Sequence, residues 1–116
     1  GITVAVAKDR AIESFMQVGE GFVVNILRED NYQKMFRHFL KRFAPGADRF
    51  ADVDVVNNIA NGGPVLSDSL AFLDCKVSSR LETPDHWIIY GVVENGSVSD
   101  LSCKTAVHHR KVANHY

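Results

Sequence analysis

Residues 70–93 read LAFLDCKVSSRL-ETPD-HWIIYGVV and hold the two longest strand patterns of the chain. Residues 70–81 alternate in polarity, and 86–93 are rich in β-branched and aromatic residues. Between them, 82–85 is typical of a turn, so we predict an antiparallel pair. Asn95-Gly96 predicts a second turn, with a third strand near Ser97-Val98. In the first strand, one face is expected to carry Ala71, Leu73, Cys75 and Val77, and the other Leu70 and Phe72.

Two further strands are expected in the first half of the chain. Apolar Ile2, Val4 and Val6 alternate with small residues, which is typical of a strand. Residues 22–27 form a near-continuous apolar run whose only polar member is Asn25. This run predicts a central strand.

A short helix is expected between these two strands. Asp9 is its candidate N-cap, and Gly19 and Gly21 are expected to end it. The residues at helical spacing are Ile12, Phe15 and Met16.

The clearest helical pattern follows the second strand. Asp30 and Gln33 resemble a capping box, Lys41 and Arg42 suit the negative end of a helix, and Pro45-Gly46 is expected to end it. The apolar stripe consists of Tyr32, Met35, Phe36, Phe39 and Leu40. The next segment, 47–66, is expected to be mostly loop, with a short strand at Val53 and Val55.

This order of elements predicts one mainly β (α+β) domain over residues 1–116. Helical and strand patterns alternate first, and long antiparallel segments dominate the second half. A small barrel with short helices at its rim accounts for this order better than a doubly wound parallel sheet.

Composition excludes several classes of function. The net charge of −1 argues against nucleic-acid binding, which normally needs a basic excess. The two cysteines form neither a disulfide scaffold nor a zinc motif. No apolar run approaches a membrane span and no leader opens the chain, so we expect a soluble intracellular protein.

Motifs for hydrolysis and for metal binding are also missing from the sequence. There is no Gly-x-Ser-x-Gly elbow, and neither cysteine lies in a catalytic signature. His108 and His109 are adjacent, and His115 follows six residues later. This spacing does not suit a shared zinc ion, so we predict no metal site.

Anion binding is better supported. Lys8-Asp9-Arg10 lies where a strand gives way to the short helix, and cations beside free N–H groups can hold a phosphate. A solvated polar turn accounts for the spacing equally well. His86 opens a strand, where an imidazole can contact a ligand or be a half-exposed strand end. Arg110, in the basic segment 108–111, can face an anionic dinucleotide or solvent.

Several runs, taken in order, resemble the flavin reductase-like family, whose fold is the FMN-binding split barrel. They are residues 3–10 (TVAVAKDR), 21–27 (GFVVNIL) and 85–93 (DHWIIYGVV). Residues 38–50 and 105–111 are similar to the C-terminal flavin reductase domain of the flavodiiron proteins of oxygenic phototrophs. The resemblance covers nearly the whole chain.

The resemblance implies an NAD(P)H:flavin oxidoreductase that passes electrons from NADH or NADPH to FMN. In the parent protein, electrons would continue to a diiron domain that reduces dioxygen to water, with a flavodoxin-like domain also present. By this resemblance the FMN phosphate would be held by Ala7, Lys8, Asp9 and Arg10. Asn25 and Leu27 would lie near the isoalloxazine or ribityl chain, although Asn25 is equally explained as a buried amide bonded to backbone. His86 and Arg110 would lie where the nicotinamide nucleotide approaches.

The resemblance also implies a homo- or hetero-dimer, located in the cytoplasm of a cyanobacterium or in the chloroplast stroma. The chain opens abruptly in a strand at Gly1 and departs from the family there. Family members carry a preceding strand and loop that contact the flavin. We therefore expect a fragment of a longer multidomain protein, which can be inactive when isolated. The alternative function is a non-catalytic split-barrel module for dimerisation or flavin binding.

Overall fold

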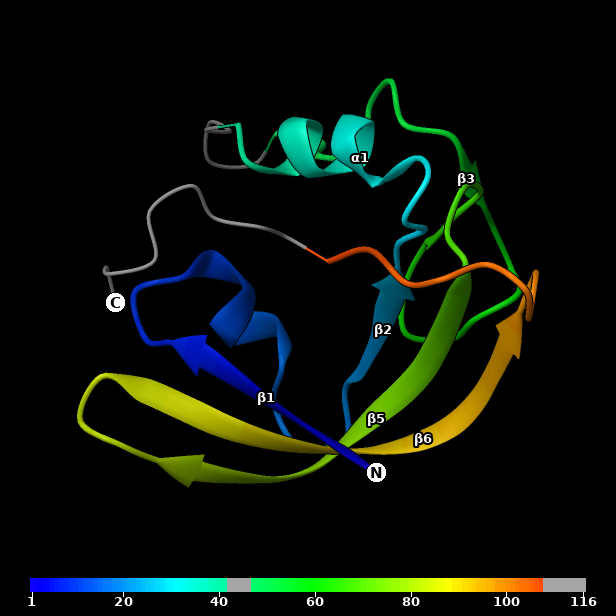
Figure 1. Ribbon diagram of the computed structural model, residues 1–116. Coiled ribbons are helices and arrows are strands. Elements are labelled where there is room, and N and C mark those ends of the chain that lie inside the picture. Colours follow the sequence, from blue (N-terminus) through cyan, green and yellow to red (C-terminus); the bar gives the residue numbers. More distant parts are fainter. Residues whose placement is uncertain (42–46, 108–116) are drawn as a thin grey trace.

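The computed structural model describes residues 1–41 and 47–107 (Figure 1). Its main element is a four-stranded antiparallel sheet in the order β1-β6-β5-β2. The strands are β1 (Ile2–Ala7), β2 (Gly21–Ile26), β5 (Ala71–Glu82) and β6 (His86–Val98). The structure confirms all four strands and the turn predicted at 82–85, except that Glu82 still belongs to β5 and pairs with Trp87.

The β5–β6 pair is longer than predicted and strongly curved. Asn95-Gly96 is not a turn, because Asn95 pairs with Asp74 and Gly96 with Leu73, so β6 continues to Val98. The separate third strand was therefore a wrong prediction. The register shifts at Asp74/Cys75 and at Val77/Ser79, and such bulges bend strands. Figure 1 shows both strands curving together, which curls the sheet into half a barrel.

The β2 strand lies at one edge of this sheet, not at its centre as predicted. Its apolar run is explained by cover on both faces, even though only β5 pairs with it. Phe22 and Val24 belong to the core cluster, while Asn25 faces the 64–66 segment through two hydrogen bonds. An apolar run in a strand thus indicates that other parts of the protein cover both faces of the strand. It does not indicate that both edges of the strand pair with neighbouring strands.

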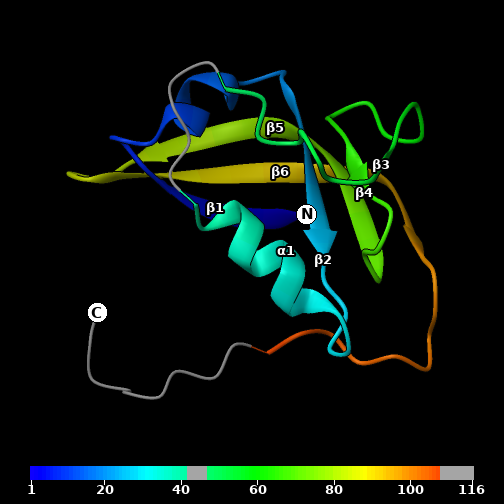
Figure 2. The ribbon, with the colours of Figure 1, turned by 90° about the horizontal axis from the view of Figure 1, so that it is seen from above.

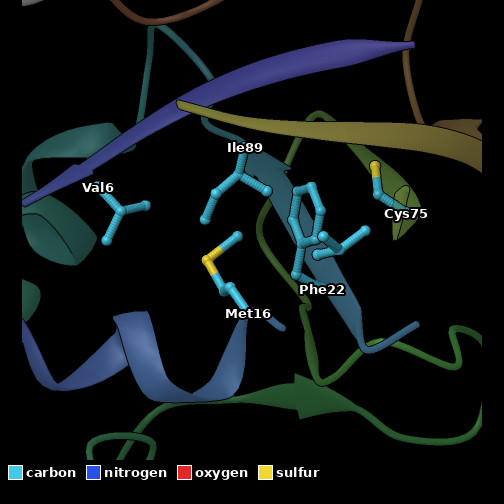
Figure 3. Close-up of a cluster of buried hydrophobic side chains, with 6 residues drawn as sticks. Val6, Met16, Phe22, Cys75 and Ile89 are labelled. Atoms are coloured by element: carbon cyan, nitrogen blue, oxygen red, sulfur yellow. The ribbon is translucent and has the colours of Figure 1, made fainter. Parts of the chain in front are cut away.

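The core lies on the concave side of the sheet, the side on which the ribbon of the short helix η1 (Ala11–Phe15) is found (Figures 1 and 2). Figure 3 shows how its side chains converge from β1, β2, β6 and the segment after η1. Gly91 is required here, because a Cβ at this position would lie 2.6 Å from the Phe22 ring. The cluster consists of Val6, Met16, Phe22, Cys75, Val77 and Ile89, with Leu73 packed against it. Leu73, Cys75 and Val77 thus share a face, as predicted.

The η1 element differs from the helix expected after β1. It is a single 3₁₀ segment of 5 residues whose N-cap is Arg10, not Asp9. Ile12 and Phe15 are 55% and 67% exposed, so only Met16 of the predicted apolar stripe is buried. A 3₁₀ segment repeats every three residues, which does not maintain the stripe that an α-helix would present.

The predicted longer helix is confirmed as α1 (Tyr32–Phe39). Its N-cap is Asn31, and the expected capping box does not form because Asp30 instead binds Arg28. Leu40 is its C-cap, so the helix ends before Pro45-Gly46, which lies outside the described residues. A two-stranded sheet of β3 (Val55–Val56) and β4 (Val65–Leu66) accompanies it, and the second core cluster is formed by Met35, Val53 and Leu66.

Together these elements confirm the predicted mainly β, barrel-like fold with helices at its rim. In the described part of the chain, no helix is long and apolar enough to cross a lipid bilayer.

Candidate functional site

A groove of about 560 Å³ lies between β1 and β2, the two edge strands of the curled sheet. Its walls are mainly apolar, and Arg10 and His86 are its polar members. The lining residues are Val4–Ala7 from β1, Arg10, Ile12 and Met16 around η1, Phe22–Val24 from β2, and His86. A groove of this composition suits a flat, largely apolar ligand with an anionic or polar end.

Backbone hydrogen bonds place Arg10 and His86 at this groove. Ala7 pairs with His86 across β1 and β6. The chain then turns, with the Arg10 N–H donating to the Ala7 carbonyl at 3.1 Å. Ala7 and Arg10, which the resemblance assigns to the FMN phosphate, therefore lie at one place with His86, which it assigns to the nicotinamide nucleotide.

Lys8 and Asp9 belong to the same turn but not to the groove lining. Lys8 Nζ lies 2.7 Å from Glu82 Oε2 and 5.6 Å from the centre of the Trp87 ring. The Lys8 N–H donates to the Asp85 carbonyl at 3.0 Å, and Asp9 is exposed. The expected contribution of a helix start is weak because η1 is a 3₁₀ segment of only 5 residues, so the positive charge at this turn is that of the Lys8 and Arg10 side chains.

His86 is oriented by its neighbour. Its Nδ1 lies 3.0 Å from Asp85 Oδ1, and this hydrogen bond, with the nearby imidazole, holds the pKa of the Asp85 carboxyl below its usual range. When Nδ1 donates its proton to Asp85, Nε2 of the neutral ring is left as an acceptor.

Asn25 and Leu27 are not among the residues that line the groove. Asn25 Oδ1 accepts the Leu66 N–H at 2.8 Å, and its Nδ2 donates to the Pro64 carbonyl at 3.4 Å. Asn25 thus forms the hydrogen bonds to backbone groups that its alternative interpretation, a structural amide, requires. Leu27 packs against the second core cluster, and its carbonyl accepts the Ala106 N–H. Arg110, His108, His109 and His115 lie outside the described residues.

Sequence analysis missed Asp74, which is only 2% exposed. Its carboxylate accepts the N–H groups of Asn61 at 2.7 Å and Gly62 at 2.9 Å. The backbone of Gly62 packs directly against the backbone of β2, because a Cβ at this position would lie 2.5 Å from the Phe22 nitrogen. Two features of the sequence could have predicted this role of Asp74: it is an acidic residue within an apolar strand, and a glycine-rich loop lies upstream of that strand.

Comparison with known proteins supplies the context for this groove. A family model described as "Flavin reductase like domain" matches residues 1–115. "Diflavin flavoprotein A 1" of Synechocystis sp. is 62% identical over 116 residues, which is 100% of this chain and 20% of that relative. The chain therefore spans about a fifth of the curated relatives it matches.

Solved structures agree with the fold. The NADH:FAD oxidoreductase SgcE6 of Streptomyces globisporus C-1027 matches with a TM-score of 0.78 at 27% identity, over 89% of this chain and 60% of that one. The same enzyme in complex with NAD and FAD fragments matches with a TM-score of 0.74 at 25% identity, over 89% and 59%. These matches confirm the expected flavin reductase split-barrel fold.

Proposed function

Because the chain belongs to the flavin reductase-like domain family, we propose that it is an NAD(P)H:flavin oxidoreductase domain that uses FMN. The observation that carries this proposal is the groove between β1 and β2, with Arg10 and His86 at its polar part. The alternative, a non-catalytic module, needs no imidazole oriented toward a ligand groove.

The groove fits the chemistry of FMN. Its volume of about 560 Å³ lies within the range of about 300–1,000 Å³ typical of ligand sites. Val4, Val24 and Phe22 provide apolar walls for a flat ring, and Arg10 provides a guanidinium for the phosphate. When bound, FMN supplies the hydride-accepting centre, and the protein supplies binding and orientation.

The turn Ala7-Lys8-Asp9-Arg10 is proposed to hold the phosphate. Arg10 lines the groove directly, and its planar fork matches phosphate oxygens. Lys8 can join it, because its ion pair with Glu82 is half-exposed and such pairs contribute little to stability. Asp9 contributes through the backbone of the turn, since a carboxylate repels phosphate.

His86 is proposed to contact the nicotinamide nucleotide, with Asp85 holding its ring in place. Arg110 is proposed to assist with the dinucleotide's charge. Asn25 and Leu27 are proposed to lie toward the isoalloxazine or ribityl chain, Asn25 mainly by fixing the 64–66 segment beside β2.

The parent protein is proposed to be a flavodiiron protein of an oxygenic phototroph. The relatives named diflavin flavoprotein, five times longer than this chain, support a multidomain parent. In it, electrons would pass from NAD(P)H through this domain to flavodoxin-like and diiron domains that reduce dioxygen to water. Dimerisation, and a location in the cytoplasm or chloroplast stroma, belong to the same proposal.

The test measures FMN binding and FMN-dependent oxidation of NADH and NADPH. We expect Arg10→Ala and Lys8→Ala to raise the KM for FMN, and His86→Ala to lower kcat/KM for the pyridine nucleotide. Lys34→Ala removes an exposed cation outside the groove and serves as the control. FMN binding without turnover would favour the non-catalytic module. If all three variants keep the FMN affinity and the rate of the unaltered chain, the proposed binding site is overturned.

A further inference from the structure

Arg80 of β5 carries a charge into the interior of the domain. Its side chain is only 10% exposed. Nη2 donates to the Glu13 carboxylate and Nη1 to the Gln17 side-chain oxygen. The guanidinium also lies 4.1 Å from the centre of the Trp87 ring. A buried cation with a carboxylate, an amide and an aromatic partner is a costly arrangement that fixes the geometry of whatever it binds.

The element that Arg80 binds has few other ties to the sheet. Each residue of η1 is exposed or half-buried, and Arg10, its N-cap, makes no side-chain capping bond within the described residues. Apolar packing begins only at Met16, after η1 has ended. Within the part of the chain that the structure describes, η1 makes few other contacts with the sheet, so the Arg80–Glu13 ion pair is its main side-chain link to β5.

The position of η1 in turn sets the position of Arg10. The Glu13 N–H donates to the Arg10 carbonyl at 3.1 Å, so the residue bound by Arg80 is bonded directly to the residue that lines the groove. Trp87 provides a second connection, because Lys8 Nζ lies 5.6 Å from the same ring that Arg80 stacks on.

We propose that Arg80 is a positioning residue of the groove: by holding η1, it keeps the Ala7–Arg10 turn where Lys8 and Arg10 meet the anionic end of the flavin. This inference rests on the proposed function. It assigns to Arg80 no contact with the flavin, since Arg80 is absent from the groove lining and acts through Glu13 and Gln17.

The experiment compares FMN with riboflavin, which has the same ring and ribityl chain but no phosphate. Dissociation constants for both are measured with the unaltered chain, with Arg80→Lys and with Gln17→Ala. Arg28→Lys is the matched control, because Arg28 is also paired with acidic side chains but lies outside the groove. We expect Arg80→Lys to weaken FMN binding by about tenfold while riboflavin binding changes little. Gln17→Ala should act in the same direction, less strongly.

A second readout does not depend on flavin. Amide hydrogen exchange at Glu13 and Met16, whose N–H groups close the turns of η1, should be faster in Arg80→Lys than in Arg28→Lys. If Arg80→Lys does not fold, the Gln17→Ala variant tests the positioning role instead, because it leaves the buried Arg80 charge paired with Glu13.

The outcomes separate the two proposals. An unchanged ratio of FMN to riboflavin affinity in the folded variants, or a parallel loss of both, overturns the positioning role and leaves the proposed function intact. An unaltered chain that binds neither flavin overturns the proposed function. In that case the amide exchange still tests Arg80: if the exchange rates of Glu13 and Met16 do not change in the Arg80→Lys variant, the positioning role of Arg80 is overturned too.

Discussion

Replacing Asp74 with Asn tests how the sheet holds the loop beside β2. The carboxylate is 2% exposed and accepts two backbone N–H groups, from Asn61 at 2.7 Å and Gly62 at 2.9 Å. An Asn side chain has one oxygen, so it can satisfy one of these donors and turns its own NH₂ toward the other. One charge-assisted bond is lost and a donor is left buried.

The size of the effect follows from these contacts. A hydrogen bond to a charged group contributes about 1.5–3 kcal/mol, so Asp74→Asn should lower the free energy of unfolding by about 2–3 kcal/mol. For a domain of this size, such a loss lowers Tm by about 10 °C or more. Asp48→Asn is the control, because Asp48 is exposed and its carboxylate accepts, among the described residues, only the Phe50 N–H, at 2.9 Å. It should cost less than about 0.5 kcal/mol.

The assay is urea unfolding followed by the fluorescence of Trp87, the only tryptophan in the chain. Circular dichroism provides an independent probe of the same transition. A loss in Asp74→Asn no greater than that in Asp48→Asn would refute the argument, since burial and the second N–H would then contribute nothing.

Three further predictions concern the same core and the groove. Gly62→Ala should lower the free energy of unfolding by about 1–3 kcal/mol, since its Cβ would lie 2.5 Å from the Phe22 nitrogen; unchanged thermal unfolding would contradict this. A thiol reagent should label Cys103 in the native state but Cys75 only on unfolding, because Cys75 is 1% exposed and burial raises the pKa of its thiol; equal labelling rates would argue against this. His86 lowers the pKa of the Asp85 carboxyl, so Asp85 stabilises the fold above its unfolded pKa of about 3.9, and this stabilisation is lost as the pH falls through the lower folded value. Asp85→Asn should therefore flatten the acid branch of the stability curve measured by urea unfolding, and an unaltered slope would count against the His86 pairing.

The strands and the longer helix were predictable because their signals are local. The apolar stripe of α1 and the alternation in β5 are set by residues a few positions apart, and both elements formed as expected. Asn95-Gly96 shows where such signals fail. A dipeptide that favours a turn was overridden by pairing with Leu73 and Asp74 across a long hairpin.

The candidate site was predictable only where its residues carry local signals, and not where the fold brings distant residues together. Lys8-Asp9-Arg10 and His86 were each notable at a strand end, but only the register of β1 on β6, which pairs Ala7 with His86, shows that the two are neighbours. Asp74 was missed because its partners are backbone N–H groups in a loop 12 and 13 residues upstream. No side-chain pattern in the sequence records a bond to backbone across such a separation.

The groove between β1 and β2 is proposed to bind FMN for reduction by a pyridine nucleotide. The most direct measurement is anaerobic mixing of the FMN-loaded chain with NADH or NADPH, followed by loss of the flavin's visible absorbance. We predict that the chain bleaches FMN faster than free FMN is bleached under the same conditions, and that Arg10→Ala and His86→Ala both reduce this acceleration. Bleaching at the rate of free FMN, with FMN shown to be bound, would contradict the claim.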